Sequence, residues 1–285
     1  MFYFIHQQVG EYSEQVNLKF LSWIGNECFN GNFKVIITDN TIQKNITNQN
    51  YIKLSSGNEY REFSGWITGL EYLKLNTSSK EISGIVLSNQ TMLSNRAFDI
   101  PMRNAIRAGI FMAQEFETPV MFGDLDLIRS QGPYFYKSID SYYISTYFIF
   151  LNKSALDFIN VLNPDDNLYK LFNKTPNCSS VLLGEYKDIE YYKVIEGWLY
   201  KNHGGPKWYL HEKLSLENYN YFSKKLFSIL TEHGISQRFV NRGGRLIGYK
   251  QFINRTIIEE IIFFMKRVKY SLGWRIKKYK KFGFF

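Results

Sequence analysis

The chain has 285 residues, of which 45% are hydrophobic and 18% aromatic, and its formal net charge is +9. These values exclude a globally disordered chain and fit one large domain or one domain with a helical appendage. Two cysteines, Cys28 and Cys178, are too few for a disulfide framework or a four-ligand zinc site. We recognise neither a signal peptide nor an apolar run of about 18 residues, so we expect a cytoplasmic protein without a spanning helix.

Most of the excess positive charge lies in residues 266–285, which read KRVKYSLGWRIKKYKKFGFF and contain no acidic side chain. Basic residues interleaved with aromatic ones are typical of a helix that lies on an anionic membrane surface. Nucleic-acid binding is the competing interpretation of a basic stretch, and a solvated helix end is the plainest one. The aromatic residues favour the membrane. We therefore expect a peripheral protein at the inner face of the cell membrane and no nucleic-acid partner.

Hydrophobic periodicity predicts strands alternating with helices along the first two thirds of the chain. We expect strands at 1–5, 33–38, 51–54, 82–87, 119–122 and 141–151, and helices at 12–29, 61–75, 101–114, 153–161 and 185–202. The remainder, from residue 214 on, reads as mostly helical. This order predicts an α/β fold with a mainly parallel sheet flanked by helices. We assign that domain to residues 1–212, and a helical, basic C-terminal extension to residues 213–285.

The strand at 82–87 ends abruptly in the polar residues Ser88, Asn89, Gln90 and Thr91. Ligands of open α/β sheets bind at the carboxyl ends of strands, so we place the floor of a nucleotide site at residues 88–91, with Ser88, Asn89 and Gln90 as the binding residues. Neutral amides and hydroxyls can hydrogen-bond a ribose or a diphosphate.

Three further residues are expected to face the same site. Asp39 ends the strand at 33–38 and can accept hydrogen bonds from a base or a ribose, although a turn-forming aspartate is the alternative. Asn58 and Arg61 precede the helix at 61–75, where Arg61 can pair with diphosphate oxygens or simply lie on the helix surface.

Two later segments carry charges suited to phosphate chemistry. Arg242 and Arg245 flank Gly243 and Gly244, and a glycine-rich basic loop can present N–H groups and guanidiniums to phosphate; a basic surface turn is the alternative. Asp124 and Asp126 follow a short apolar run, and carboxylates are preferred ligands of Mg²⁺ and Mn²⁺. A loop with a helix-capping aspartate is the alternative there.

Several of these segments together resemble a family of bacterial polysaccharide glycosyltransferases, the rhamnan-synthesis type, with a GT-A-like nucleotide-binding fold. The segments are 58–70 (NEYREFSGWITGL), 84–91 (GIVLSNQT) and 141–156 (SYYISTYFIFLNKSAL). The similarity covers roughly residues 33–202. It implies transfer of a sugar from a UDP-, GDP-, CMP- or dTDP-sugar to a hydroxyl of a lipid-linked glycan. The pathway implied is assembly of a bacterial surface polysaccharide, O-antigen or capsule.

The chain departs from the family in one chemical respect. Family members carry an acid in the triplet that here reads Ser88-Asn89-Gln90, and that acid holds a divalent metal against the diphosphate. Either transfer proceeds without metal, or Mn²⁺ or Mg²⁺ binds elsewhere, and D-x-D at Asp124 and Asp126 is the usual motif of this fold class.

An inverting transfer also needs a general base for the acceptor hydroxyl. We expect Glu190, in a stretch similar to the family's Tyr-Glu region, with Asp140 as the second candidate. Two other functions stay open. One is a catalytically degenerate, membrane-associated binding protein, and the other is a metal-dependent nucleotidyl- or phosphotransferase that uses Asp124 and Asp126.

Overall fold

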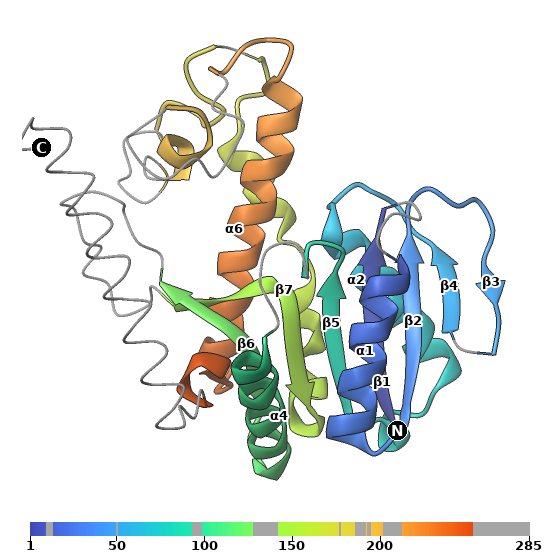
Figure 1. Ribbon diagram of the computed structural model, residues 1–285. Coiled ribbons are helices and arrows are strands. Elements are labelled where there is room, and N and C mark those ends of the chain that lie inside the picture. The colour runs from blue at the N-terminus through green and yellow to red at the C-terminus, as the bar shows by residue number, and fades with distance from the viewer. Residues whose placement is uncertain are drawn as a thin grey trace, which may run out of the picture.

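The computed structural model describes residues 1–9, 14–49, 51–92, 99–127, 142–176, 178–185, 192, 195–201 and 213–252. Within these ranges, eight strands form one sheet in the order β3-β4-β2-β1-β5-β7-β6-β8 (Figure 1). The strands are β1 (Phe2–Gln8), β2 (Phe33–Asp39), β3 (Ile46–Thr47), β4 (Tyr51–Ser55), β5 (Gly84–Asn89), β6 (Val120–Leu127), β7 (Tyr142–Asn152) and β8 (Arg245–Gly248).

The sheet is mostly parallel. β1 lies between β2 and β5 and is parallel to both, β4 continues the parallel run beyond β2, and β8 is parallel to β6. β7 is antiparallel to β5 on one side and to β6 on the other, and the two-residue β3 is antiparallel to β4. The carboxyl ends of β1, β2, β4, β5, β6 and β8 therefore point the same way.

Helices cover both faces of the sheet. The longer ones are α1 (Glu14–Phe29), α2 (Glu62–Asn76), α4 (Ile100–Glu115) and α6 (Tyr219–Asn241). Shorter helical turns are η1 (Ser79–Glu81), η2 (Lys153–Leu162), η3 (Asp166–Leu171), η4 (Gly197–Lys201) and η5 (Tyr249–Phe252). Local capping defines some of these starts: Asp99 accepts a hydrogen bond from the backbone nitrogen of Met102 at 3.1 Å, and Pro101 follows at the first turn of α4.

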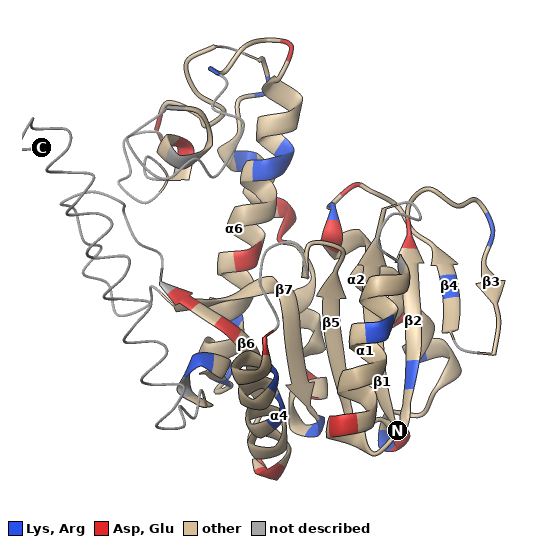
Figure 2. Ribbon diagram, in the orientation of Figure 1, with Lys and Arg blue, Asp and Glu red and all other residues tan. Residues whose placement is uncertain are grey.

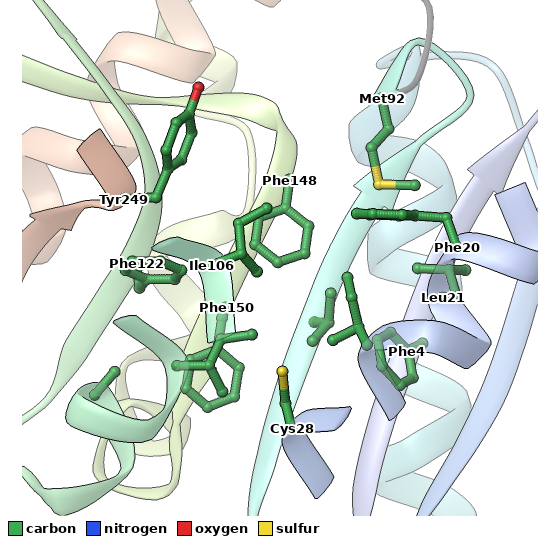
Figure 3. Close-up of a cluster of buried hydrophobic side chains, with 14 of the residues drawn as sticks. Phe4, Phe20, Leu21, Cys28, Met92, Ile106, Phe122, Phe148, Phe150 and Tyr249 are labelled. Carbon is green, nitrogen blue, oxygen red and sulfur yellow. The ribbon is translucent and has the colours of Figure 1, made fainter. Parts of the chain in front are cut away.

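Two apolar layers hold these helices to the sheet. On one face, α1 and α4 pack through residues such as Leu21 and Ile106 against aromatic side chains of the strands, among them Phe4, Phe122 and Phe150 (Figure 3). On the other face, α2, η2 and part of α6 pack on the alternate strand residues. A third cluster surrounds the amino-terminal half of α6, which extends beyond the sheet (Figure 1). Strands buried on both faces explain the continuous apolar runs in the sequence.

The α/β architecture predicted from the sequence is confirmed, with three differences in its elements. β6 extends through Leu127, so Asp124 and Asp126 lie within a strand and not in a loop after it. The helical prediction from residue 214 holds for α6, but Arg245–Gly248 form β8, because these residues hydrogen-bond to the exposed edge of β6. Of the helix expected at 185–202, Glu185 lies in a turn, and the described residues 192 and 195–201 are helical.

Candidate functional site

A polar cleft of about 790 Å³ opens at the carboxyl ends of the parallel strands. Gln7 and Val9 line it at the end of β1, Asn89 and Gln90 at the end of β5, and Asn40 after β2. The chain adds β2 and β4 on one side of β1 and then β5 on the other side, so the strand order reverses between β1 and β5. Ligands of open α/β sheets bind at such a reversal. Asn89 and Gln90, expected at the floor of a site, thus line a cleft in the position that this rule favours.

Both amides are oriented by hydrogen bonds that use their oxygen atoms. Oδ1 of Asn89 accepts from the backbone nitrogen and the hydroxyl of Thr91, at 3.1 and 2.6 Å. Oε1 of Gln90 accepts from the backbone nitrogen of Val9 at 3.0 Å. Nδ2 of Asn89 also donates to the carbonyl oxygen of Thr146 at 3.4 Å. The NH₂ group of Gln90 and the second N–H of Asn89 are therefore the parts best suited to a ligand, and they would donate to its oxygen atoms.

Ser88 lies below the cleft and is fully buried. Its hydroxyl is 3.0 Å from Nδ1 of His6, and its carbonyl oxygen accepts a hydrogen bond from the indole of Trp66 at 3.1 Å. Ser88 therefore joins β5 to β1 and to α2. It is not among the residues that line the cleft.

The start of α2 forms a second wall, which carries Asn58, Arg61 and Glu62. Arg61 has φ 55° and ψ −129°, a backbone conformation that L-residues rarely adopt and that costs on the order of 1–3 kcal/mol. Its guanidinium carbon lies 5.7 Å from the ring centre of Tyr221 on α6. Nη1 is buried and makes no hydrogen bond to the described residues. The strained backbone thus holds the guanidinium of Arg61 in the cleft, where Nη1 can still donate a hydrogen bond to a ligand.

One face of α6 forms the third wall. Its cleft residues recur at helical spacing and are Tyr221, Lys224, Lys225, Ser228, Ile229 and Glu232. Ser228 donates a hydrogen bond to Oε1 of Glu62 at 3.0 Å, which joins α6 to α2. Charges of both signs along α6, and the acidic positions on β6, are visible in Figure 2.

Glu232 faces an irregular part of β7. The pairing of β6 with β7 shifts between Gly123 and Leu125, and next to this shift Ser145 and Thr146 turn toward the cleft. The backbone nitrogen of Thr146 donates to Oε1 of Glu232 at 2.6 Å.

The pKa of Glu232 is shifted into the neutral range. Burial raises it to about 7, and the charge of Glu62 acts in the same direction. The hydrogen bond from Thr146 and the charge of Lys225 oppose this shift without cancelling it. A carboxyl group with such a pKa takes up and releases a proton near neutral pH, as a general base or acid requires.

Asp39 does not line the cleft, although its neighbour Asn40 does. The carboxylate is fully buried and forms an ion pair with Lys53 at 3.0 Å. Its other oxygen accepts from the backbone nitrogen and the hydroxyl of Thr41, at 2.9 and 2.7 Å. Both oxygens thus stabilise the end of β2, and the structure does not bring Asp39, which we expected to read a base or ribose, into the cleft.

Asp124 and Asp126 contact the same cation, the ammonium of Lys250, at 2.9 and 3.7 Å. Asp124 is fully buried and also accepts a hydrogen bond from the hydroxyl of Tyr147. Asp126 lines the cleft. Within the described ranges no cluster of three or more His, Cys, Asp or Glu side chains is arranged to hold a metal ion. The residues present therefore do not fit the divalent metal site that the sequence suggested.

Arg242 and Arg245 lie away from the cleft. Arg245 begins β8 and pairs with Val120 at the start of β6, so it belongs to the amino end of these strands. Its guanidinium carbon lies 5.5 Å from the ring centre of Phe116. Arg242 is exposed at the end of α6. The structure does not bring the two arginines that we expected to bind phosphate into this cleft, because the parallel pairing of β8 directs them to the opposite end of the sheet.

The two residues that we expected as catalytic bases, Glu190 and Asp140, lie outside the described residues. Glu196, another acid of the same stretch, is buried and satisfied: its Oε1 accepts from the hydroxyl of Ser180 at 2.6 Å and from the backbone nitrogen of Val181 at 3.0 Å. Glu196 therefore has a structural role.

Five residues of the cleft were not predicted from the sequence: Glu62, Tyr221, Lys224, Lys225 and Glu232. A weak signal for the α6 residues was present. Lys224, Ser228 and Glu232 recur at intervals of four residues, a spacing that puts them on one face of a helix. Nothing in the local sequence indicates that β7 and α2 lie opposite them.

Comparisons with protein-family models, with curated proteins and with solved structures found no match to this chain. Its function is therefore inferred from the cleft and the residues that line it.

Proposed function

We propose that the protein is a glycosyltransferase that uses a nucleotide-sugar donor, with a GT-A-like nucleotide-binding domain. The observation that carries this proposal is the polar cleft at the strand-order reversal, with a carboxyl group of pKa about 7 in its wall. A nucleotide sugar needs a site of this kind. It has a polar base and ribose, a charged diphosphate and a sugar whose hydroxyls require many hydrogen-bonding groups.

The cations of the cleft suit the diphosphate. Arg61 and Lys224 lie on opposite walls, α2 and α6, and Lys225 neighbours Lys224. Hydrogen bonds between such groups and phosphate oxygens are short and strong, and they stabilise the charge that develops when the diphosphate leaves. The amide groups of Asn89 and Gln90 at the end of β5 suit the oxygens of the ribose or the base.

Glu232 suits the role of general base. In an inverting transfer the acceptor hydroxyl gives its proton to the carboxylate, its oxygen bonds to the anomeric carbon, and the bond to the diphosphate breaks. A base of pKa about 7 is largely ionised just above neutral pH and still accepts a proton readily. The hydrogen bond from the backbone nitrogen of Thr146 holds the carboxylate in place.

The acceptor that we propose is a hydroxyl of a lipid-linked glycan, in the assembly of a bacterial surface polysaccharide. This part rests on the sequence resemblance and on the basic, aromatic segment 266–285, which lies outside the described residues. An amphipathic basic segment would keep the enzyme at the membrane surface, where such an acceptor is concentrated.

A metal-dependent nucleotidyl- or phosphotransferase is less well supported. It would need Asp124 and Asp126 as metal ligands, and Lys250 contacts both carboxylates. A degenerate binding protein would bind a nucleotide but would not turn over a donor, so the two activities must be measured separately.

The test is calorimetric and thermal-shift titration of the full chain with UDP, GDP, CMP, dTDP and their sugars. We expect one nucleotide class to stabilise the fold. Arg61→Ala should weaken its binding about tenfold or more, the loss of a charged hydrogen bond of about 1.5–3 kcal/mol. Glu232→Gln should retain binding and lose transfer.

The matched control is Arg242→Ala, which removes the same charge at an exposed position far from the cleft and should leave the affinity unchanged. If no nucleotide binds, or if both arginine variants bind equally well, the proposed function is wrong. If the nucleotide binds and its sugar is never turned over, the degenerate protein is the better description.

A further inference from the structure

The ammonium of Lys250 lies between the two carboxylates that a D-x-D metal motif would use. Asp124 and Asp126 are two residues apart on β6, and the parallel register that pairs Gly123 with Gly248 brings the residues after β8 alongside them. Nζ of Lys250 is 2.9 Å from Oδ1 of Asp124 and 3.7 Å from Oδ1 of Asp126. The ammonium of Lys250 thus forms ion pairs with both aspartates.

Neighbouring side chains stabilise the buried carboxylate of Asp124. The carboxylate of Asp124 is 0% exposed, and a buried charge of this kind is destabilising unless it is paired and hydrogen-bonded. Lys250 supplies the pairing, and Tyr147 donates a hydrogen bond to the second oxygen. The hydroxyl of Tyr249, next to Lys250, lies 3.2 Å from that of Tyr147. Both oxygens of Asp124 are therefore occupied.

The protonation states agree with this geometry. Partial burial alone would lower the pKa of Lys250, but the hydrogen bond to Asp124 and the charges of both aspartates outweigh it and raise the pKa. Burial, followed by the charge of Asp124, raises the pKa of the Tyr147 hydroxyl. Both groups thus keep their protons at neutral pH and stay hydrogen-bond donors.

A divalent metal ion does not fit at this position. To bind Oδ1 of Asp124 it would have to displace the ammonium, and an ion placed beside the ammonium would meet a like charge. Hard divalent cations also prefer about six oxygen ligands, and the described residues offer no third carboxylate or imidazole there.

We infer that Lys250 takes the place of the divalent cation, so that the cleft binds its nucleotide diphosphate without metal. This inference rests on the proposed function. Asp126 and Tyr147 line the cleft, so the ammonium lies beside it, and the side chain of Lys250 is 51% exposed. An ammonium has three N–H donors, and the contact with Asp124 uses one. The remaining donors can reach a phosphate oxygen, while Arg61 and Lys224 supply the rest of the positive charge.

The first experiment titrates Mn²⁺ alone into the full chain and follows free Mn²⁺ by electron paramagnetic resonance. We expect no specific binding to the wild type. Lys250→Ala should bind Mn²⁺ at least about tenfold more tightly than the wild type, the equivalent of about 1.4 kcal/mol, because the ammonium that contacts both carboxylates is then absent. Adding Asp126→Asn should abolish this gain. Lys250→Arg keeps the charge and should behave like the wild type.

Specific Mn²⁺ binding by the wild type that Asp126→Asn removes would overturn the inference. If Lys250→Ala does not fold, the wild type, Lys250→Arg and Asp126→Asn still decide the question. These titrations contain no nucleotide, so their result does not depend on the proposed function.

The second experiment measures nucleotide binding with EDTA or with Mn²⁺. Equal affinities in the wild type, and an affinity reduced in Lys250→Ala with EDTA, are expected. An affinity that EDTA abolishes would overturn the inference but leave the proposed function standing. Failure to bind any nucleotide under either condition would overturn the proposed function, and with it the role of Lys250 in binding diphosphate.

Discussion

Glu232 shows how one residue obtains its chemistry from its neighbours. The residue lies on α6. Its carboxylate accepts a hydrogen bond from Thr146 on β7, and the charge of Glu62 on α2 raises its pKa. Burial by these elements disfavours the ionised form and raises the pKa to about 7. A solvent-exposed glutamate at the same place in the chain would be ionised throughout the physiological range and a much weaker base.

We expect Glu232→Gln to raise the free energy of unfolding at pH 8 by about 2–3 kcal/mol and to change it little at pH 4. The pKa of Glu232 is about 7 in the folded protein, above its ordinary value of 4.5. Its stabilising contribution is therefore complete below pH 4.5 and is lost as the pH rises through 7. Glutamine keeps the acceptor for Thr146 without the charge. Urea denaturation at the two pH values measures the difference.

The control is Glu217→Gln, an exposed acid at the start of the same region, which should have the same small effect at both pH values. If Glu232→Gln lowers the free energy of unfolding equally at pH 4 and pH 8, burial does not raise the pKa of this carboxyl group.

Among the elements, α2 determines the shape of one wall of the cleft, and its glycines determine how closely it approaches the sheet. A Cβ atom at Gly69 would lie 2.5 Å from Cγ2 of Ile5, and one at Gly65 would lie 2.5 Å from Oγ1 of Thr38. The helix is thus in direct contact with β1 and β2 along this side. Arg61, which immediately precedes the helix, depends on that contact for its position.

We expect Gly69→Ala to lower the free energy of unfolding by about 1–2 kcal/mol. Overpacking costs about 1–3 kcal/mol, and the better helix propensity of alanine returns at most about 1 kcal/mol of that. Nucleotide affinity should fall as well, because α2 moves outward with Arg61. Chemical denaturation and calorimetry measure the two effects.

Gly57→Ala provides the comparison, since nothing lies within 4 Å of a Cβ at that position; we expect it to change stability by less than about 1 kcal/mol. Equal effects of the two substitutions would mean that α2 tolerates a methyl group against β1.

At the scale of the whole molecule, the C-terminal part completes both the sheet and the cleft. α6 packs on β7, β8 pairs with β6, and Lys250 follows β8. The residues that we first assigned to an extension therefore supply Glu232 and the cation beside Asp124. Within the described ranges no helix is long and apolar enough to cross a membrane.

We expect the full chain to sediment with vesicles of phosphatidylcholine and phosphatidylglycerol, and deletion of residues 266–285 to abolish this binding. Each basic residue near an anionic surface contributes about 1 kcal/mol, and salt screens the attraction. Binding should therefore weaken as the salt concentration rises, and vesicles of phosphatidylcholine alone should bind much less. Equal sedimentation of the full and shortened chains would rule out the segment as the membrane contact, and binding to an oligonucleotide instead would favour the nucleic-acid interpretation.

Prediction from the sequence succeeded where the pattern is local. The apolar run at 82–87 followed by polar residues located Asn89 and Gln90 at the end of β5, in the cleft. The local pattern did not indicate that Asp39 would pair with Lys53 on β4, because this contact depends on strand order. The position of Arg245 was not predictable for a similar reason: the basic turn before β8 gives no sign that this strand would join β6 and direct the arginine to the other end of the sheet.

Residues a few positions apart specify which segments become helices or strands, because hydrophobic periodicity and capping act over one or two turns. The α/β class and the polar end of β5 follow from such patterns. The pKa of Glu232 and the place of Lys250 between Asp124 and Asp126 depend on residues about a hundred positions or more apart in the chain. Packing of α6 and β8 against the sheet brings these groups together, and burial then sets the strength of their charges.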